Sequence, residues 1–265
     1  MNGHLLDPLP LAGLFLLGFG IIFFAIEVGF RIGSRRTASG QRVEPGPVGA
    51  VVGAVLGLLA FMVALTFSMA ASRYDHRKSL LLDEVNAIDA AYLRAGLLPE
   101  PQRSESRKLL REYVTLRADV VATVGEPGGL ERMALTAEDM QTALWTEVES
   151  LYGLERITPA YSLFASALND LSRLHRSRLV FAAQYRIPNS VWTVLAAAAI
   201  VAMTIVGFQF GLSGRRSLFA TSAIATIFSA VLLLIADLDR PLSGLLAVSQ
   251  QPMVELAARL ERMSP

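Results

Sequence analysis

PVGAVVGAVLGLLAFMVALTFSMAASRYDHRKSLLLDEVN, residues 47–86, is the stretch that decides the fold. Residues 48–71 carry no charge, and about 24 helical residues span ~36 Å, enough to cross a hydrocarbon core of about 30 Å. At Arg73 the composition turns polar, and no proline or glycine stops the helix there. We therefore predict one helix that crosses a membrane and continues beyond it with polar side chains.

Small residues recur along one face of the apolar half of this stretch. This ridge consists of Gly49, Gly53, Gly57, Ala60, Ala64, Ser68 and Ser72. In lipid, such a ridge lets two helix backbones approach closely, because packing rather than the hydrophobic effect drives helix association there. Packing against another span of the same chain, contact between subunits and the lining of a pore all fit this pattern.

The composition indicates an integral membrane protein. Of the 265 residues, 53% are hydrophobic and 18% are charged, whereas soluble domains contain about 25% charged residues. The formal net charge is +1 and there is no basic stripe, which argues against a nucleic-acid partner. The absence of cysteine excludes disulfides and thiolate sites. The first residues lack the basic region of a signal peptide, so we expect a retained membrane anchor.

Four segments are long and apolar enough to span a membrane, so we predict an all-α, multi-pass protein of the cell membrane. The other three spans are expected at residues 9–30, 191–210 and 217–236. The chain then divides into a transmembrane hairpin at 9–72, a helical stalk at 73–188, a second hairpin at 189–240 and an amphipathic tail at 241–265. Within the stalk, helices are predicted over 79–95, 101–124, 137–152 and 160–185, with Thr136 as the N-cap of the third.

The charges near the spans bear on orientation. The short loops after the first and third spans hold Arg31, Arg35, Arg36, Arg42, Arg215 and Arg216, with Glu44 as their only acid. The positive-inside rule places these loops in the cytoplasm and the stalk outside. The stalk also carries basic residues near the membrane, so both orientations stay open. Glu27, near the end of the first span, is interpreted as an interfacial carboxylate that pairs with Arg31, with a functional carboxylate as the alternative.

Three polar clusters are candidate sites. Residues 72–78, SRYDHRK, fit either an interfacial anchor or, in an oligomer, a charged ring at a pore mouth. In residues 83–89, stalk salt bridges are favoured over a cation site, since consecutive helical residues do not share a face. Asp237 and Asp239 with Arg240 are interpreted as a cap and an interface fixture at the end of the fourth span.

Signals for an enzyme are missing from the sequence. The three histidines, His4, His76 and His175, have no spacing that suits a metal ion. The sequence contains no nucleophile elbow, no phosphate-binding loop and no dinucleotide fingerprint. We therefore expect neither an enzyme, nor a cofactor, nor a metal site.

Several motifs resemble the bestrophin-like family of membrane proteins, whose own activity is not established. They occupy residues 59–68, 72–78, 84–88, 91–95, 110–114 and 238–244, and the resemblance covers roughly residues 48–263. The motif residues include Glu84, Asn86, Asp239, Arg240 and Pro241. The family is also weakly similar to bestrophins, which are pentameric anion channels with four spans per subunit.

The likeness to bestrophins implies that the second span lines a pore. The charged exit of that pore would be Arg73, Tyr74, Asp75 and Arg77. Aligned on this exit, the gate positions fall near Ala60, Ala64 and Ser68, which are small. A shift by one position offers Phe61, Leu65 and Met69 instead, which can form an apolar constriction. Bestrophins keep the region between spans two and three in the cytoplasm, opposite to the count of loop charges.

Two hypotheses for function follow. The first is a channel or permeation pathway for small inorganic ions, formed in the lipid bilayer by a homo-oligomer around the second span, pentameric if it follows the bestrophins. The second is a non-conducting membrane scaffold or sensor whose stalk binds a partner.

Overall fold

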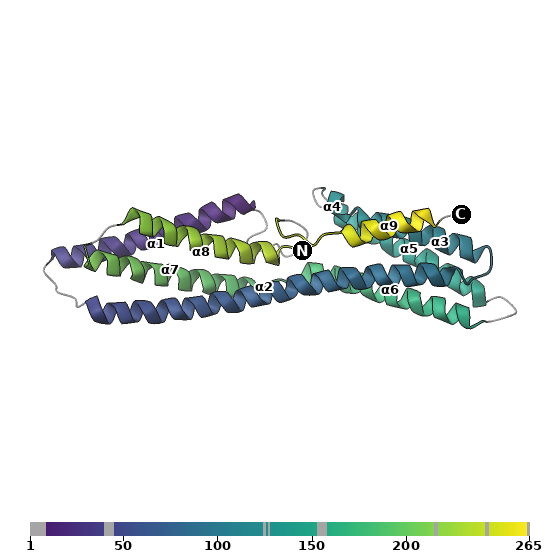
Figure 1. Cartoon of the computed structure of the whole chain (residues 1–265), viewed down its shortest axis with the longest axis horizontal. Helices are drawn as coiled ribbons and strands as arrows, with labels where there is room; N and C mark the ends of the chain where they lie inside the picture. Colours follow the sequence, from purple (N-terminus) through teal and green to yellow (C-terminus); the bar gives the residue numbers. More distant parts are fainter. Residues whose placement is uncertain are drawn as a thin grey trace. The chain divides into compact units, whose positions relative to one another are not determined.

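A computed structural model describes residues 9–39, 45–123, 126, 128–152, 158–214, 217–241 and 244–263. These residues form helices and connecting segments without strands, which confirms the all-helical prediction (Figure 1). The helices are α1 (Leu11–Ala38), α2 (Pro45–Ala95), α3 (Gln102–Ala118), α4 (Val120–Thr123), α5 (Gly129–Tyr152), α6 (Pro159–Gln184), α7 (Asn189–Leu212), α8 (Leu218–Asp239) and α9 (Gln251–Arg262).

The chain divides into two compact units. Unit 1 comprises Met1–Arg73, Arg186–Arg240 and Gly244–Leu246, and unit 2 comprises Tyr74–Tyr185, Pro241–Ser243 and Ala247–Pro265. Helix α2 contributes its apolar part to unit 1 and its polar part to unit 2. Four helices, α1, α2, α7 and α8, are long and apolar enough to cross a membrane, and they are the four segments predicted as spans.

The spans in unit 1 extend beyond their predicted ends. Helix α1 continues to Ala38, so Arg31 and Arg35 lie on the helix rather than in a loop. Helix α2 already begins at Pro45, where the sequence Pro-Gly-Pro suggested a turn. Proline is accepted in the first turn of a helix, because the amide hydrogen that it lacks would have no intrahelical partner there.

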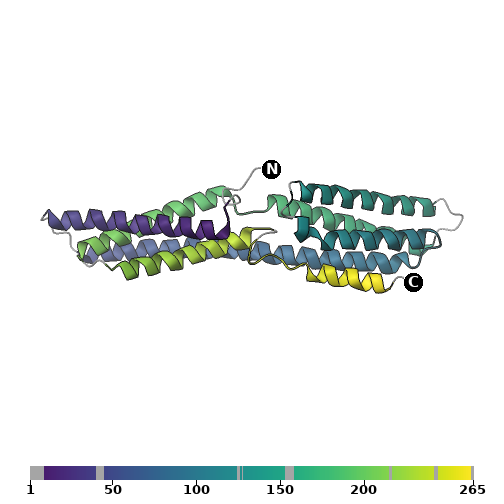
Figure 2. The same ribbon diagram turned by 90° about the horizontal axis from the view of Figure 1, so that it is seen from above.

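Glycines bring α1 and α7 into close contact in unit 1. A Cβ atom added to Gly29 would collide with the carbonyl oxygen of Thr204, and one added to Gly207 would collide with that of Ile26. Gly33 and Gly211 make the same kind of contact one turn further along. The two helices cross in Figure 2, and only residues without side chains fit at this crossing.

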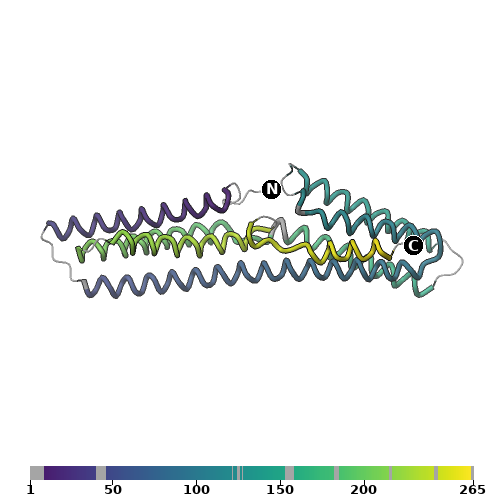
Figure 3. The backbone as a smooth tube through the Cα atoms, turned by 45° about the horizontal axis from the view of Figure 1, so that its top comes forward, coloured from purple at the N-terminus to yellow at the C-terminus, as the bar shows by residue number. Residues whose placement is uncertain are grey.

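Unit 2 surrounds a conventional hydrophobic core. Its fully buried side chains include Tyr92 of α2, Tyr113 of α3, Leu144 of α5 and Phe164 of α6. Helix α9 adds Leu256 to the same core, so the amphipathic tail packs against the helices that precede it in sequence (Figure 3). Helix α9 is therefore a structural part of unit 2.

Two helix boundaries in unit 2 differ from the prediction. The helix expected over 101–124 ends as α3 at Ala118, and the short α4 follows Asp119. Helix α5 begins at Gly129 rather than at residue 137. The hydroxyl of Thr136 donates to the carbonyl oxygen of Arg132 at 2.9 Å inside this helix, so its assignment as an N-cap was wrong.

Candidate functional site

One face of α2 is exposed in unit 1, and it carries most of the small-residue ridge. The exposed residues are Gly53, Gly57, Ala60, Ala64, Ser68 and Ser72, together with Phe61, Leu65 and Met69. The opposite face packs inward through residues that include Leu59, which is 2% exposed, and Thr66. We call the exposed set the α2 outer face.

The glycines of α2 differ in what surrounds them. Among the described residues, none comes within 4 Å of a Cβ atom added to Gly53 or Gly57. Gly49 differs, because its Cβ would lie 3.1 Å from the side-chain nitrogen of Gln209 on α7. Packing within the described part of the chain therefore involves Gly49, whereas Gly53 and Gly57 have open space beside them.

The end of the second span is tied to two other spans through Asp239. This carboxylate is 4% exposed and lies 3.7 Å from a guanidinium nitrogen of Arg73 on α2. It also accepts a hydrogen bond from the backbone N–H of Ile187 at 2.9 Å and lies 3.5 Å from Nε of Arg186, both just before α7. Since Asp239 ends α8, one buried carboxylate fastens α2, α7 and α8 together.

The neighbours of Asp239 anchor two further segments of unit 1. Asp237 caps the turn after α8, because its carboxylate accepts hydrogen bonds from the backbone N–H groups of Leu245 and Leu246 at 3.0–3.1 Å. Arg240 donates to the carbonyl oxygen of Leu9 at 2.5 Å, just before α1. The sequence suggested that Asp237, Asp239 and Arg240 cap and fix the end of the fourth span, and these contacts agree with that interpretation.

The remaining exit residues belong to unit 2. Asp75 is exposed, and Tyr74 and Arg77 are half-buried. The ring of His76 lies 4.5 Å from that of Phe181 on α6, measured between centroids. In unit 1, Glu27 and Arg31 form the predicted ion pair at 2.9 Å.

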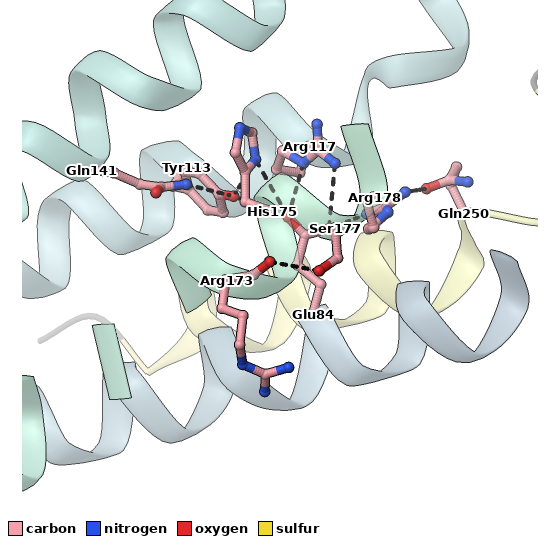
Figure 4. A network of polar contacts seen from close by, with 9 residues as sticks. All are labelled: Glu84, Tyr113, Arg117, Gln141, Arg173, His175, Ser177, Arg178 and Gln250. Atoms are coloured by element: carbon pink, nitrogen blue, oxygen red, sulfur yellow. Dashed lines mark hydrogen bonds and ion pairs between the residues drawn. The ribbon is translucent and has the colours of Figure 1, made fainter. Parts of the chain in front are cut away.

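A buried polar network occupies the interior of unit 2, centred on Glu84 (Figure 4). The Glu84 side chain has no exposed surface. Its Oε1 accepts from Nε of Arg117 at 3.2 Å and from the hydroxyl of Tyr113 at 2.9 Å, and its Oε2 accepts from Arg117 at 3.3 Å. Arg178 of α6 also donates to Oε2. One carboxylate on α2 thus holds two guanidinium groups from α3 and α6.

A second layer of contacts extends this network. The Tyr113 hydroxyl lies 3.0 Å from Nδ1 of His175 and accepts from the amide nitrogen of Gln141 on α5 at 3.4 Å. Arg178 donates to the amide oxygen of Gln250, just before α9, at 3.4 Å. Side chains from α2, α3, α5, α6 and the segment before α9 therefore meet in one connected cluster.

The network shifts the proton affinities of its members. Burial raises the pKa of Glu84, but contact with His175 and the charges of Arg117 and Arg178 outweigh it, so the pKa lies well below its usual range. Burial and the nearby Glu84 raise the pKa of Tyr113 well above its usual value. Glu84 is therefore ionised and Tyr113 is neutral at physiological pH.

The sequence indicated some of these contacts and missed others. Glu84 does form stalk salt bridges, as the pattern of residues 83–89 suggested. Asn86 lies apart from this network on the exposed side of α2, and Asp89 pairs with Arg259 of α9 at 2.5 Å. No signal in the sequence identified Arg117 and Arg178 as partners, because they are distant in the chain. Within the described part of the chain, no three acidic or histidine side chains gather around a possible metal position.

Comparison with known proteins gives a consistent result. The family model of the Bestrophin-like domain matches residues 21–253. A crystal structure of a point variant of a bacterial bestrophin homolog from Klebsiella pneumoniae superposes with a TM-score of 0.68 at 13% identity, covering 94% of this chain and 98% of that chain. A second variant of that homolog gives 0.65 at 15% identity, with 96% and 98% covered.

A further solved structure, described as a membrane protein, gives a TM-score of 0.67 at 15% identity and covers 96% of this chain and 98% of that chain. At these identities the likeness shows a shared fold. A search of curated proteins found no match.

Proposed function

We propose, on the premise that the chain belongs to the bestrophin-like family, that it forms a homo-oligomeric ion channel in the cell membrane. The family resemblance read from the sequence is confirmed by the match over residues 21–253. Bestrophins, which this family resembles, are anion channels, and their second span lines the pore. By this analogy, the α2 outer face surrounds the ion pathway, and four spans per subunit cross the membrane.

The observation that carries this proposal is the exposure of the α2 outer face. Gly53 and Gly57 have open space beside them, and Ser68 and Ser72 present hydroxyl groups on the same side. A face that only contacted lipid would gain nothing from glycine or serine, because lipid solvates large apolar side chains equally well. Small and hydroxyl-bearing residues suit a surface that meets copies of itself around a wet axis.

The position of a gate depends on which residues point at that axis. If Phe61, Leu65 and Met69 face it, they form an apolar constriction that gates by excluding water. If Ala60, Ala64 and Ser68 face it, the pore is wide along the same length. Both sets lie on the α2 outer face, so the two registers are distinguished by function rather than by exposure.

Flux measurement tests the proposal. The full-length protein is purified, its mass in detergent is measured, and it is reconstituted into liposomes loaded for halide or cation flux. We expect an oligomer and a measurable flux. Phe61→Ala should raise the flux if Phe61 forms the constriction, whereas Ala60→Phe should block it if Ala60 faces the axis.

A matched control is available on another span. Phe24 of α1 is 68% exposed, comparable to the 61% of Phe61, but it is not on α2. Phe24→Ala should leave the flux unchanged. A monomer by mass, together with no flux of either ion class, would overturn the proposal.

A non-conducting scaffold or sensor is the second candidate. An open groove of about 820 Å³ between α2 and α6 in unit 2 supports it, lined by residues that include His76, Arg173 and Phe181. This candidate predicts stable capture of a partner by unit 2 in the absence of flux. Removal of that capture by Arg173→Glu, with unchanged folding, would assign the groove as the binding surface.

A further inference from the structure

A small, partly open cavity lies in unit 2 beside the Glu84 network. Its volume is about 40 Å³, larger than the ~10–15 Å³ that one water molecule needs. It is lined by Arg77, Leu80, Leu81, Arg178, Phe181, Pro241, Val248 and Gln250. Among these described residues, the two charged side chains are both arginines, so the polar part of the wall is cationic.

The charges around this cavity do not balance. Glu84 supplies one negative charge, and both Arg117 and Arg178 pair with it. The side chains of these two arginines are 5% and 13% exposed, so water screens their charges weakly. A buried cation without a full counter-charge is costly, which favours the uptake of an anion next to it.

The environment of Arg178 shows this cost. Burial lowers the pKa of its guanidinium group, and the charge of Arg117 lowers it further, so the attraction of Glu84 does not compensate. In the described part of the chain, Arg178 donates to Glu84 and to one neutral acceptor, the amide oxygen of Gln250 at 3.4 Å. Gln250 is 8% exposed and lines the cavity next to Arg178.

We propose that this cavity binds one small monovalent anion, such as chloride, between the guanidinium groups of Arg77 and Arg178. The apolar side chains of Leu80, Leu81 and Phe181 exclude larger, strongly hydrated anions. The anion supplies the negative charge that the interior of unit 2 lacks and thereby stabilises the packing of α2 against α6. The inference does not depend on conduction, because the site belongs to unit 2 and the proposed pore face to unit 1.

Halide-dependent stability tests the site in the full-length protein. Thermal unfolding is followed by circular dichroism in detergent at constant ionic strength, with sodium gluconate replaced stepwise by sodium chloride or bromide. We expect the melting temperature to rise with halide concentration. At ten times the dissociation constant, linkage shifts the folding equilibrium by a factor of about 11. An equal melting temperature in gluconate and halide would overturn the proposal.

Two variants assign the effect to this cavity. Gln250→Glu places a carboxylate beside Arg178, so it should raise the melting temperature in gluconate and remove the halide response. Gln251→Glu adds the same charge at the next position, which is exposed, and should keep the halide response. A full halide response in Gln250→Glu would contradict the site. Crystals grown in bromide should show anomalous density between Arg77 and Arg178, and density for water alone would also contradict it.

Discussion

The two units of this chain hold their helices together in different ways. In unit 1, large apolar side chains such as Phe24, Phe61 and Phe219 are 61–85% exposed. In unit 2, Tyr92, Tyr113 and Phe164 are completely buried. Water drives apolar side chains into the core of unit 2, whereas lipid leaves those of unit 1 no such preference. In unit 1, close approach of glycine backbones adds to a smaller cluster of buried apolar side chains, whereas unit 2 relies on its larger hydrophobic core.

The units also differ in where they place charge. Unit 2 buries Glu84 at its centre with two arginines, while unit 1 places the Asp239 cluster where three of its spans begin or end. A buried charge is tolerated only when partners surround it. Each unit therefore depends on one buried carboxylate, Glu84 in unit 2 and Asp239 in unit 1.

Removal of the Glu84 charge should have the largest effect. Glu84→Gln keeps the shape of the side chain but removes the carboxylate charge that Arg117 and Arg178 share, which should cost about 3–5 kcal/mol of unfolding free energy. Urea unfolding of the purified protein, followed by circular dichroism, measures it. Asp83→Asn is the control, because Asp83 is exposed and should change stability by less than about 0.5 kcal/mol. Equal losses in both variants would show that the network does not stabilise unit 2.

Low pH should also destabilise the protein, because it protonates the carboxylate of Glu84. The folded pKa of Glu84 lies below the unfolded value of about 4.3, so its stabilisation is complete above that pH. It is lost as the pH falls below ~4 towards the folded pKa. Unfolding free energy measured between pH 7 and pH 2 should fall less steeply in Glu84→Gln than in the wild type. Parallel curves for the two proteins would contradict this assignment.

In unit 1, the comparison is between two sets of glycines. Gly29→Leu should separate α1 from α7 and cost about 1–3 kcal/mol or more, because backbone atoms occupy the space of the new side chain. Gly57→Leu places the same side chain in open space and should leave the stability of the monomer unchanged. Unfolding by dodecyl sulfate at a fixed protein concentration measures both. If Gly57→Leu destabilised the monomer as much as Gly29→Leu, the distinction between the sets would fail.

The smallest effect is expected at the Tyr113 hydroxyl. Tyr113→Phe removes the hydrogen bond to Glu84 and the contact with His175, and should cost about 1–2 kcal/mol. Tyr152→Phe is the matched control, since Tyr152 is 50% exposed. Denaturant unfolding of the two variants should therefore give different midpoints. Coinciding midpoints would mean that water replaces the hydroxyl at no cost.

Most of the fold was predictable from the sequence because long uncharged segments have few alternatives to a membrane span. The ends of helices were less predictable. Arg31 and Arg35 did not stop α1, because a polar side chain on a helix reaches water without breaking backbone hydrogen bonds. The early start of α5 at Gly129 was missed because Thr136 resembled an N-cap, whereas its hydroxyl donates to the carbonyl oxygen of Arg132 inside the helix.

The candidate site was predictable only in part. The sequence predicted salt bridges for residues 83–89 as a group, but the partners of Glu84, Arg117 and Arg178, are 33 and 94 residues away. Only the packing of α3 and α6 against α2 selects them from the other arginines. The glycines illustrate the same limit: Gly29 and Gly33, Gly207 and Gly211, and those of α2 all repeat every four residues. Spacing alone does not tell which of them meets another helix.

The turn after α8 has a consequence for how this sequence can vary. Gly244 adopts φ of +121°, and a Cβ atom there would collide with the carboxylate of Asp237, which caps the turn. Two reasons therefore exclude a side chain at position 244: the backbone conformation would be strained, and the new side chain would collide with the carboxylate of Asp237. Positions 237 and 244 should therefore vary together among related sequences. A sequence without glycine at 244 should also lack the acid at 237.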